Sequence, residues 1–513
     1  MPPPFIETDG GGFFRSFFLS RSEHLCYYRP VRIRDTGKRY YYLEAVGYMG
    51  KNRNSFSGTV GFVLASAGSA IGLGNIWRFP YFAAKNGGGL FLVTYLCLLV
   101  TFGITLLVTE IAIGRKTRHS PLRAYGTIHP KWRWIGIFST LVPFLILPYY
   151  CVIGGWVLKY FVVFLSGDLE LAVGSGFFVE HIRSVAEPLV FMAIYIFLTA
   201  FVIYRGINQG IEKLSRVLMP ILLLLVIGIA CFCLTIRFDD GSVVRTGLDG
   251  LKVYLIPEIG DITMARLMSV VLDAMGQLFF SISVAMGIMI AYGSYFDDKG
   301  DILKSAVQIE FFDTFVAFLA GVMIILPVYV FLGKDGMSAS GPSLLFISMP
   351  TVFHSMGVVG TVVGTAFFLM VFFAALTSSI SIMEAVISSL MEAFSWTREK
   401  ATIIEGLVAL GIGAVVCLGY NALYFEISMP HGATGQILDI FDFLSNNIFM
   451  PVVAIATCLL IGWGVKPEIV VDEMTKNGET FKYKWFYSVM IRFVVPVLLT
   501  VLFMQSLGLI SAS

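Results

Sequence analysis

Two short stretches of the sequence combine residue types that could bind a small ligand. The first reads Gly68-Ser-Ala-Ile-Gly-Leu-Gly-Asn-Ile-Trp-Arg-Phe-Pro80, and the second reads Gly276-Gln-Leu-Phe-Phe-Ser-Ile-Ser-Val-Ala-Met-Gly287. Glycine and proline interrupt helices, and an interrupted helix inside a membrane is tolerated only where its backbone lines a cavity. Carbonyl oxygens freed at such a break can coordinate cations, and the N-terminus of the following half-helix attracts a carboxylate.

Helix packing is the alternative explanation for these glycines, because small residues let two helices approach closely. Asn75 and Arg78 favour a binding site. A charged side chain at the centre of a bilayer costs about 2.5–3.5 kcal/mol and is found mainly where it has a function.

The composition places both stretches in a membrane protein. Of the 513 residues, 57% are apolar and 14% charged, the net charge is +2 and the mean hydropathy is +0.81. Soluble proteins carry about 25% charged residues, so a soluble enzyme, a disordered protein and a nucleic-acid binder are excluded. Residues 90–113 contain one ionisable group, Glu110, and such a run is long enough to span a bilayer. The runs are too long for barrel strands, and no cysteine or histidine spacing indicates a disulfide or a metal site.

The sequence predicts an all-α polytopic membrane protein with eleven transmembrane helices. The expected spans lie near residues 58–82, 88–114, 134–166, 186–204, 212–235, 266–295, 303–332, 357–392, 400–423, 435–463 and 485–509. Basic residues concentrate in the short loops on one side, above all between the second and third spans. Because such loops stay in the cytoplasm, we expect a multi-pass plasma-membrane protein with a cytoplasmic N-terminus and an external C-terminus.

Residues 1–48 differ from the rest, being rich in arginine and tyrosine. Their apolar patch at residues 13–19 is too short for a signal peptide. Met49-Gly-Lys-Asn-Arg would be a natural start of translation, so we expect residues 1–48 to be a disordered cytoplasmic tail or to precede the native start. Residues 49–510 would then form the membrane domain.

The two interrupted spans are the first and the sixth, and each opens a group of five. This arrangement suggests two repeats, at about residues 58–235 and 266–463, followed by an extra helix at about 485–509. Broken helices at matching positions of two inverted repeats are typical of the binding site of a secondary transporter.

Several motifs resemble the neurotransmitter:sodium symporter family. They are Ala70-Ile-Gly-Leu-Gly-Asn-Ile-Trp-Arg-Phe-Pro80, Asn86-Gly-Gly-Gly89, Gly114-Arg115, Tyr149-Tyr150, Gly276-Gln-Leu-Phe-Phe-Ser281, Leu376-Thr-Ser-Ser379 and Phe441-Asp-Phe443. The resemblance covers residues 51–510 and implies a fold like that of the bacterial leucine transporter, with inverted five-helix repeats and discontinuous helices one and six. It also implies a symporter of the cell membrane rather than an enzyme, with sodium ions, a small substrate and the lipid bilayer as its partners.

The resemblance implies two co-transported sodium ions. The first would be bound by Ala70, Asn75, Ser281 and Asp313 and by the substrate's carboxylate. The second would be bound by carbonyls of Gly68, Ile71 and Ala374 and by the hydroxyls of Thr377 and Ser378. Oxygen ligands suit a hard cation. For the two hydroxyls, bonding to the preceding helical turn is the alternative explanation.

Asp313 departs from the leucine transporter, which has asparagine there and a glutamate one turn later, where this chain has Ala317. Animal relatives bind chloride at positions that match Tyr95, Gln277 and Ser281. Because a fixed carboxylate can replace the anion, we expect chloride-independent transport.

The resemblance also indicates the substrate. The monoamine transporters' aspartate is replaced by Gly72, so the substrate itself should supply the anionic group, which favours an α-amino acid over an amine. The matching side-chain pocket carries no formal charge, so we expect a neutral amino acid with a hydrophobic or aromatic side chain. Backbone amides of Leu73 and Gly74 and the Tyr150 hydroxyl would hold its carboxylate. The remaining pocket residues would be Ser69, Ala70, Ile146, Phe280, Ser281, Ser283, Met286, Ser378 and Ile382.

Two charged pairs match the family's gates. Arg78 and Asp442 would close the outer side, and Arg53 and Glu392 the inner side. In the fifth span, Gly210 and Pro220 are separated by nine residues, which the resemblance associates with local unwinding near the second sodium site.

Three rival functions remain open on the sequence. An amino-acid- or amine-gated ion channel would carry polar rings along a pore, and a non-transporting amino-acid sensor would need only one gate. A membrane enzyme would need a grouped catalytic set, whereas His119, His129 and His354 are scattered over loops. The sequence does not indicate the oligomeric state.

Overall fold

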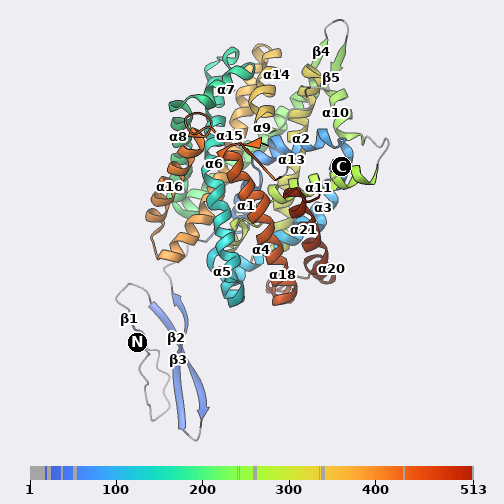
Figure 1. Cartoon of the computed structure of the whole chain (residues 1–513). Helices are drawn as coiled ribbons and strands as arrows, with labels where there is room; N and C mark the ends of the chain where they lie inside the picture. Colours follow the sequence, from blue (N-terminus) through green and yellow to red (C-terminus); the bar gives the residue numbers. More distant parts are fainter. Residues whose placement is uncertain are drawn as a thin grey trace. The chain divides into compact units, whose positions relative to one another are not determined.

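Figure 1 shows the computed structural model of the chain, in which helices dominate. The structure describes residues 18–19, 25–35, 38–49, 55–239, 241, 243–257, 263–333, 336, 341–430 and 434–510. The chain divides into two compact units, Met1–Ser55 and Phe56–Ser513.

The first unit contains a three-stranded antiparallel sheet in the order β1-β2-β3. Its strands are β1 (Phe18–Leu19), β2 (Leu25–Asp35) and β3 (Lys38–Met49). In the β2–β3 pair, Leu25 lies opposite Met49 and Asp35 opposite Lys38. That residues 1–48 are a tail or precede the native start stays a prediction.

The second unit is helical, with two small antiparallel strand pairs, β4 (Arg237–Asp239) with β5 (Val244–Thr246) and β6 (Ile427–Ser428) with β7 (Thr434–Gly435). Its first half contains α1 (Thr59–Ala70), η1 (Gly74–Arg78), α2 (Phe79–Lys85), α3 (Gly89–Leu98), η2 (Leu99–Gly103), α4 (Ile104–Thr117), α5 (Pro121–Ile128), η3 (Pro130–Trp132), α6 (Arg133–Ser166), η4 (Leu169–Ala172), α7 (Ser175–Arg183), α8 (Ala186–Tyr204), η5 (Ile207–Glu212), α9 (Lys213–Thr235) and α10 (Gly247–Leu255). Its second half contains α11 (Met264–Ser281), α12 (Ile288–Ser294), α13 (Ile302–Leu332), η7 (Leu344–Ser348), α14 (Met349–Ser355), α15 (Val358–Phe394), α16 (Arg398–Leu418), α17 (Ile437–Asp442), η8 (Phe443–Phe449), α18 (Met450–Leu459), η9 (Leu460–Gly464), α19 (Glu468–Met474), α20 (Lys484–Val489), η10 (Met490–Val494) and α21 (Val495–Ser506).

Among the described residues, nine helices are long and apolar enough to cross a membrane, and the pair Thr59–Ala70 and Gly74–Lys85 forms a tenth candidate that is bent by 54°. The predicted sixth span corresponds to α11 and α12, which are separated by residues 282–287. Every predicted span therefore overlaps one or more helices, while eleven as the number of membrane crossings stays a prediction.

Both interruptions lie where the sequence predicted them. Helix α1 ends at Ala70, Ile71 is extended, and the chain resumes as the π-helix η1 at Gly74. Between α11 and α12, Ser283 and Ala285 have positive φ values of 54° and 62°. The two broken helices meet, because the Gln277 side chain of α11 donates a 3.2 Å hydrogen bond to the Gly74 carbonyl. Helix α1 also packs on α9, α13 and α15, so both breaks lie inside the bundle.

Glycine permits close contact between α4 and α12. A Cβ added at Gly114 would lie 2.2 Å from the Ile290 carbonyl oxygen, and one at Gly293 would lie 2.6 Å from the Ile111 carbonyl oxygen. The backbones of the two helices are thus in direct contact on both sides, and neither position has room for a methyl group.

We expect Gly114→Ala to lower the melting temperature of the purified protein in detergent, since overpacking at a backbone contact costs about 1–3 kcal/mol. The matched control is Gly411→Ala on α16, where an added Cβ meets nothing within 4 Å. That control should be neutral or stabilising by about 0.5–1 kcal/mol, because alanine is the better helix former. Equal melting temperatures for the two variants would contradict the close α4–α12 contact.

Candidate functional site

Three of the four residues predicted for the first sodium site lie together, and each comes from a different element. The Asn75 amide of η1 donates to Asp313 Oδ1 of α13 at 2.7 Å. Ser281 is the last residue of α11. Its hydroxyl lies 3.0 Å from Asn75 Oδ1 and 2.9 Å from Asp313 Oδ1. The fourth residue, Ala70, is buried at the end of α1. All four are buried, so the cluster is a polar centre inside an apolar bundle.

The side chains that form hydrogen bonds with the Asp313 carboxylate are all neutral. Besides Asn75 and Ser281, the Tyr95 hydroxyl lies 3.5 Å from Asp313 Oδ2. The Asp313 carboxylate therefore lies beside Tyr95 and Ser281, two of the three residues that the sequence resemblance matched to the chloride-binding positions of animal relatives. The third, Gln277, bonds instead to the Gly74 carbonyl.

The second predicted sodium site is formed where α15 meets the end of α1. The Ser378 hydroxyl lies 3.0 Å from the Ser69 carbonyl, 3.3 Å from that of Ile71 and 3.5 Å from that of Gly68. Ser378 thus reaches the broken helix.

Thr377 makes the local bonds that were the alternative explanation, because its hydroxyl lies 3.1 Å from the carbonyls of both Phe373 and Ala374. It is nevertheless close to α1, since a Cβ added at Gly68 would lie 3.2 Å from the Thr377 Cβ. Gly68, Ile71, Ala374, Thr377 and Ser378 are therefore joined by direct contacts, through Ser378 to Gly68 and Ile71 and through Thr377 to Gly68 and Ala374.

The predicted carboxylate-binding groups lie beside Ser378 of the second cluster. The Leu73 amide points to the Tyr150 hydroxyl at 3.5 Å. A Cβ at Gly72 would lie 2.8 Å from the Ser378 hydroxyl and 3.1 Å from that of Tyr150. Gly72 therefore lets both hydroxyls approach the backbone closely.

The rest of the predicted pocket joins the two breaks. The Ser283 hydroxyl donates to the Ser69 carbonyl at 3.2 Å, and a Cβ on Gly74 would lie 2.8 Å from the Phe280 ring. The remaining apolar residues of the predicted pocket are buried: Ile146, Met286 and Ile382.

Carboxylates that sequence reasoning did not assign to the site also surround it. Glu110 of α4 accepts a 2.6 Å hydrogen bond from the Ala285 amide in the break of the sixth span. Glu310, one turn before Asp313 on α13, is buried, and neither of its carboxyl oxygens has a hydrogen-bond partner in the described part of the chain. The sequence shows Glu110 as the single ionisable group of its apolar run. Its partner, the Ala285 amide, is distant in the chain, so no local pattern predicts the hydrogen bond between them.

The two residues predicted to close the outer side, Arg78 and Asp442, form their contacts with other side chains. The Arg78 guanidinium lies over the Phe280 ring, 5.3 Å from its centroid, while Asp442 accepts hydrogen bonds from Tyr149 at 3.1 Å and Asn446 at 2.6 Å. Within the described residues no ion pair joins Arg78 to Asp442. Their role as a gate stays a prediction.

Of the two residues predicted to close the inner side, only Glu392 can be placed, because Arg53 lies outside the described residues. Glu392 accepts hydrogen bonds from the backbone amide of Ser120 at 3.0 Å and from its hydroxyl at 2.7 Å. Sequence reasoning missed a second charged pair nearby, in which Arg398 binds both carboxyl oxygens of Glu384. The same carboxylate accepts a 2.9 Å hydrogen bond from Tyr295.

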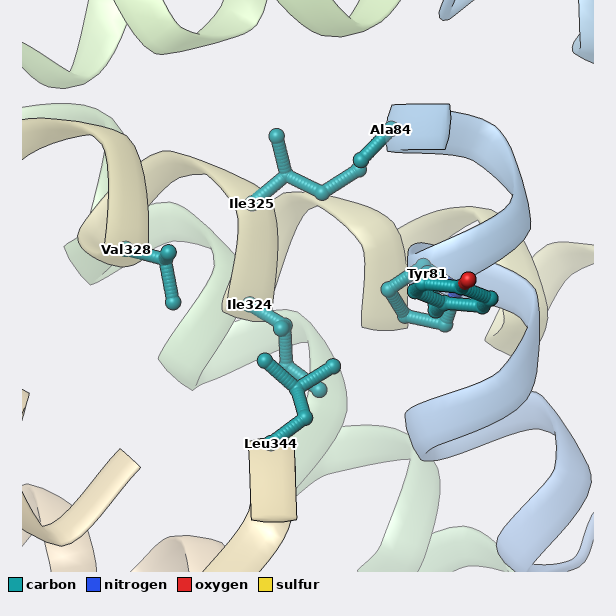
Figure 2. Close-up of a pocket in the computed structure, with 7 residues that line it drawn as sticks. Tyr81, Ala84, Ile324, Ile325, Val328 and Leu344 are labelled. Carbon is teal, nitrogen blue, oxygen red and sulfur yellow. The ribbon is translucent and has the colours of Figure 1, made fainter. Parts of the chain in front are cut away.

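A small apolar pocket lies apart from these clusters. Figure 2 shows it between α2, α13 and η7, with the side chains of Tyr81, Ile324 and Leu344 among its walls. None of the predicted substrate-binding residues lines it. The polar groups converge instead at the two helix breaks.

Broken helices that meet among buried polar groups, inside a bundle of apolar spans, define a multi-pass membrane transporter. Residues 53–181 and 171–512 match the sodium:neurotransmitter symporter family, and the chain belongs to that family. Its predicted nature as a transporter rather than an enzyme is thereby confirmed.

Relatives and a solved structure agree with this assignment. The chain is 34% identical over 460 residues to the uncharacterized sodium-dependent transporter YhdH of Bacillus subtilis, covering 88% of this chain and 97% of the relative. It is 26% identical over 511 residues to the human sodium- and chloride-dependent GABA transporter 2, covering 89% and 80%. The crystal structure of MhsT in complex with L-phenylalanine matches with a TM-score of 0.77 and 32% identity, covering 89% of this chain and all of that one. The predicted fold, like that of the bacterial leucine transporter, is confirmed, and transport is sodium-dependent.

Proposed function

We propose that the protein is a chloride-independent symporter that moves neutral hydrophobic or aromatic amino acids into the cell together with two sodium ions. The observation that carries this proposal is the position of the Asp313 carboxylate, which lies among Asn75, Ser281 and Tyr95 in the first predicted sodium site. Two sodium ions and a zwitterionic substrate bring a charge of +2 into a low-dielectric site. One fixed carboxylate reduces that charge to +1 without a bound anion.

The two ions would occupy the two clusters at the helix breaks. At the first site, Ala70, Asn75, Ser281 and Asp313 supply oxygen ligands, and the substrate carboxylate completes the set. At the second site, the ligands are the carbonyls of Gly68, Ile71 and Ala374 and the hydroxyls of Thr377 and Ser378. Oxygen atoms are the ligands that hard cations prefer, and both sets come from broken or facing helices.

The substrate would bind between the ions. Its carboxylate would meet the amides of Leu73 and Gly74, at the positive N-terminal end of η1, and the Tyr150 hydroxyl. The predicted side-chain wall carries no formal charge, which supports a neutral side chain: Ile146, Phe280, Ser283, Met286 and Ile382. MhsT, which shares the fold, was solved with L-phenylalanine, and this ligand supports the aromatic class.

Alternating access would open the site to one side at a time, with a cytoplasmic N-terminus. Arg78, Asp442 and Phe280 would control the outer side, and Arg53 and Glu392 the inner side. At about −100 mV each inward charge releases roughly 2.3 kcal/mol. A tenfold sodium gradient adds about 1.4 kcal/mol per ion. Two ions thus supply on the order of 7 kcal/mol for concentrating the substrate.

Uptake into liposomes tests this proposal. The purified protein should accumulate labelled phenylalanine, tryptophan or leucine when sodium is higher outside, and the same uptake should occur when gluconate replaces chloride. Competition by each of the twenty amino acids would define the substrate. Saturable binding without accumulation would indicate a sensor instead, and a substrate-gated current without saturable uptake would indicate a channel. A strict requirement for chloride would contradict the role given to Asp313.

A further inference from the structure

Four of the seven tryptophans of the chain lie in three short segments that meet at one end of the bundle. The segments are residues 131–134 in η3 and α6, residues 463–466 at the end of η9, and residues 482–485 at the start of α20. Trp132 contacts the end of η9, since a Cβ added at Gly464 would lie 3.6 Å from its Nε1. Trp463 donates a 3.1 Å hydrogen bond to the Arg492 carbonyl of η10, which continues α20. These contacts join all three segments.

The tryptophans of these segments face outward rather than into the core. Trp463 is 59% exposed and Trp485 is 78% exposed, and Trp134 stacks on Trp132 with ring centroids 6.1 Å apart. Amphipathic tryptophan rings concentrate where a membrane meets water. The rings therefore indicate that this end of α6, η9 and α20 lies at the level of the lipid headgroups.

The same segments are strongly basic. Together with Arg492 they contain six basic residues and no acidic one: Lys131, Arg133, Lys466, Lys482, Lys484 and Arg492. Arg492 is half-buried and the other five are exposed, and within the described part of the chain no ion pair includes any of the six. Other basic residues at this end are paired, because Arg115 binds Glu473 and both Arg118 and Lys476 bind Asp298. The charge of the six is thus available to an anion from outside the chain.

Arg492 gives this surface a specific binding group. Its side chain packs against Gly462, 3.2 Å from an added Cβ, and its Nε donates a 3.0 Å hydrogen bond to the Gly462 carbonyl. That bond caps the end of η9, where carbonyls lack partners within the helix, and fixes the guanidinium in place. A guanidinium has five N–H donors and can bind a phosphate through two parallel hydrogen bonds. Arg492 follows Lys484 by eight residues, which places it roughly 12 Å further along the helix than the exposed lysines.

We propose that this surface, the tryptophan–arginine rim, binds an anionic phospholipid of the surrounding bilayer. The Arg492 guanidinium holds the phosphate, and the exposed lysines contact the rest of the headgroup. A lipid fits better than a free phosphate, because the exposed rings of Trp463 and Phe493, with centroids 5.3 Å apart, offer acyl chains an apolar contact beside Arg492. Basic clusters at the ends of membrane helices, and basic pockets between such helices, bind anionic headgroups. The bound lipid would bridge the tenth and eleventh predicted spans.

Native mass spectrometry of the full-length protein, with phosphatidylglycerol or phosphatidylcholine added to the detergent, tests the proposal. The wild type should bind phosphatidylglycerol more than about tenfold more tightly, because each basic residue near the membrane surface contributes a factor of about five. Arg492→Gln should lower the affinity for phosphatidylglycerol about fivefold, and Arg492→Lys, which keeps the charge without the fork, should retain part of it. The double variant Lys482→Gln with Lys484→Gln changes only exposed side chains and should lower the affinity about 25-fold.

The matched control is Lys400→Gln. Lys400 is also an exposed lysine beside a tryptophan, since its Nζ lies 4.9 Å from the centroid of the Trp396 ring, but it lies outside the rim. Its replacement should leave the affinity for both lipids unchanged. A loss equal to that of Arg492→Gln would show that net charge, rather than the rim, attracts the lipid.

Fluorescence quenching locates the bound lipid. Phosphatidylglycerol with brominated acyl chains, as a minor component of phosphatidylcholine vesicles, should quench the tryptophan emission of the wild type more than brominated phosphatidylcholine does. The difference should largely disappear in Arg492→Gln. Equal affinity of the wild type for both lipids, or unchanged affinity in Arg492→Gln and in the double lysine variant, would overturn the proposal. Full competition by soluble glycerol phosphate would overturn it too, because the rim would then bind the phosphate group alone. None of these outcomes bears on the proposed transport function.

Discussion

Asp313→Asn is expected to reduce sodium-driven uptake in chloride-free buffer by about 100-fold or more. The side chain keeps its shape, but the site loses the one negative charge that lies among Asn75, Ser281 and Tyr95. Removing one partner of a buried charge pair costs about 3–5 kcal/mol, and each 1.4 kcal/mol is a factor of ten. Initial rates of labelled-substrate uptake at a series of sodium concentrations would measure the loss, which should appear mainly as a higher half-saturating sodium concentration.

Chloride provides the diagnostic comparison for this variant. The lost charge lies beside Tyr95 and Ser281, two positions that the sequence resemblance matched to the chloride site of animal relatives. Adding chloride should therefore restore part of the uptake of Asp313→Asn and leave the wild type unchanged. Glu405→Gln serves as the control for neutralising a buried carboxylate elsewhere in the bundle, and should respond to neither sodium nor chloride differently from wild type. Full activity of Asp313→Asn without chloride would show that the carboxylate does not balance the sodium charge.

Tyr150→Phe is expected to weaken substrate binding by about 10- to 100-fold. The hydroxyl lies beside the Leu73 amide and the Gly72 backbone, where the substrate carboxylate is proposed to bind. A hydrogen bond to a charged group contributes about 1.5–3 kcal/mol, which corresponds to this range. Isothermal titration or a scintillation proximity assay with the preferred amino acid would measure the affinity at saturating sodium.

The matched control for that variant is Tyr160→Phe on the same helix. Its hydroxyl donates a 2.8 Å hydrogen bond to the Phe346 carbonyl and belongs to none of the proposed sites. Tyr160→Phe should lower the melting temperature slightly and leave the affinity unchanged. An equal loss of affinity in both variants would place the effect of Tyr150 in helix stability rather than in substrate recognition.

The sequence predicted the helical elements well because the apolar runs and the breaks have local causes. The glycines before Asn75 and the isolated Glu110 are visible in any single stretch of sequence. The predicted third span at residues 134–166 corresponds to α6, Arg133–Ser166. The exact form of the sixth span could not be predicted, because the non-glycine residues Ser283 and Ala285 adopt positive φ only where tertiary contacts hold them.

In the candidate site too, contacts with a local sequence signal were predicted, and contacts that depend on tertiary packing were not. Ser378 was predicted from its motif, and the structure places its hydroxyl among the carbonyls of the broken helix. Arg78 and Asp442 were predicted as a pair, yet each interacts with other neighbours, since an ion pair depends on side-chain positions that sequence spacing does not determine. The pair formed by Glu384 and Arg398 was not predicted, because its two members come from different helices, α15 and α16.

The hydrogen bond from the Ala285 amide to Glu110 has a consequence for how new specificities arise. The backbone that shapes one wall of the proposed pocket is held by α4, a helix that contributes no residue to the proposed substrate contacts. Random mutagenesis followed by growth on an unfamiliar nutrient should therefore recover changes at Glu110 and its neighbours on α4, alongside changes in the lining itself. The range of transported substrates would then evolve partly through residues that do not contact the substrate.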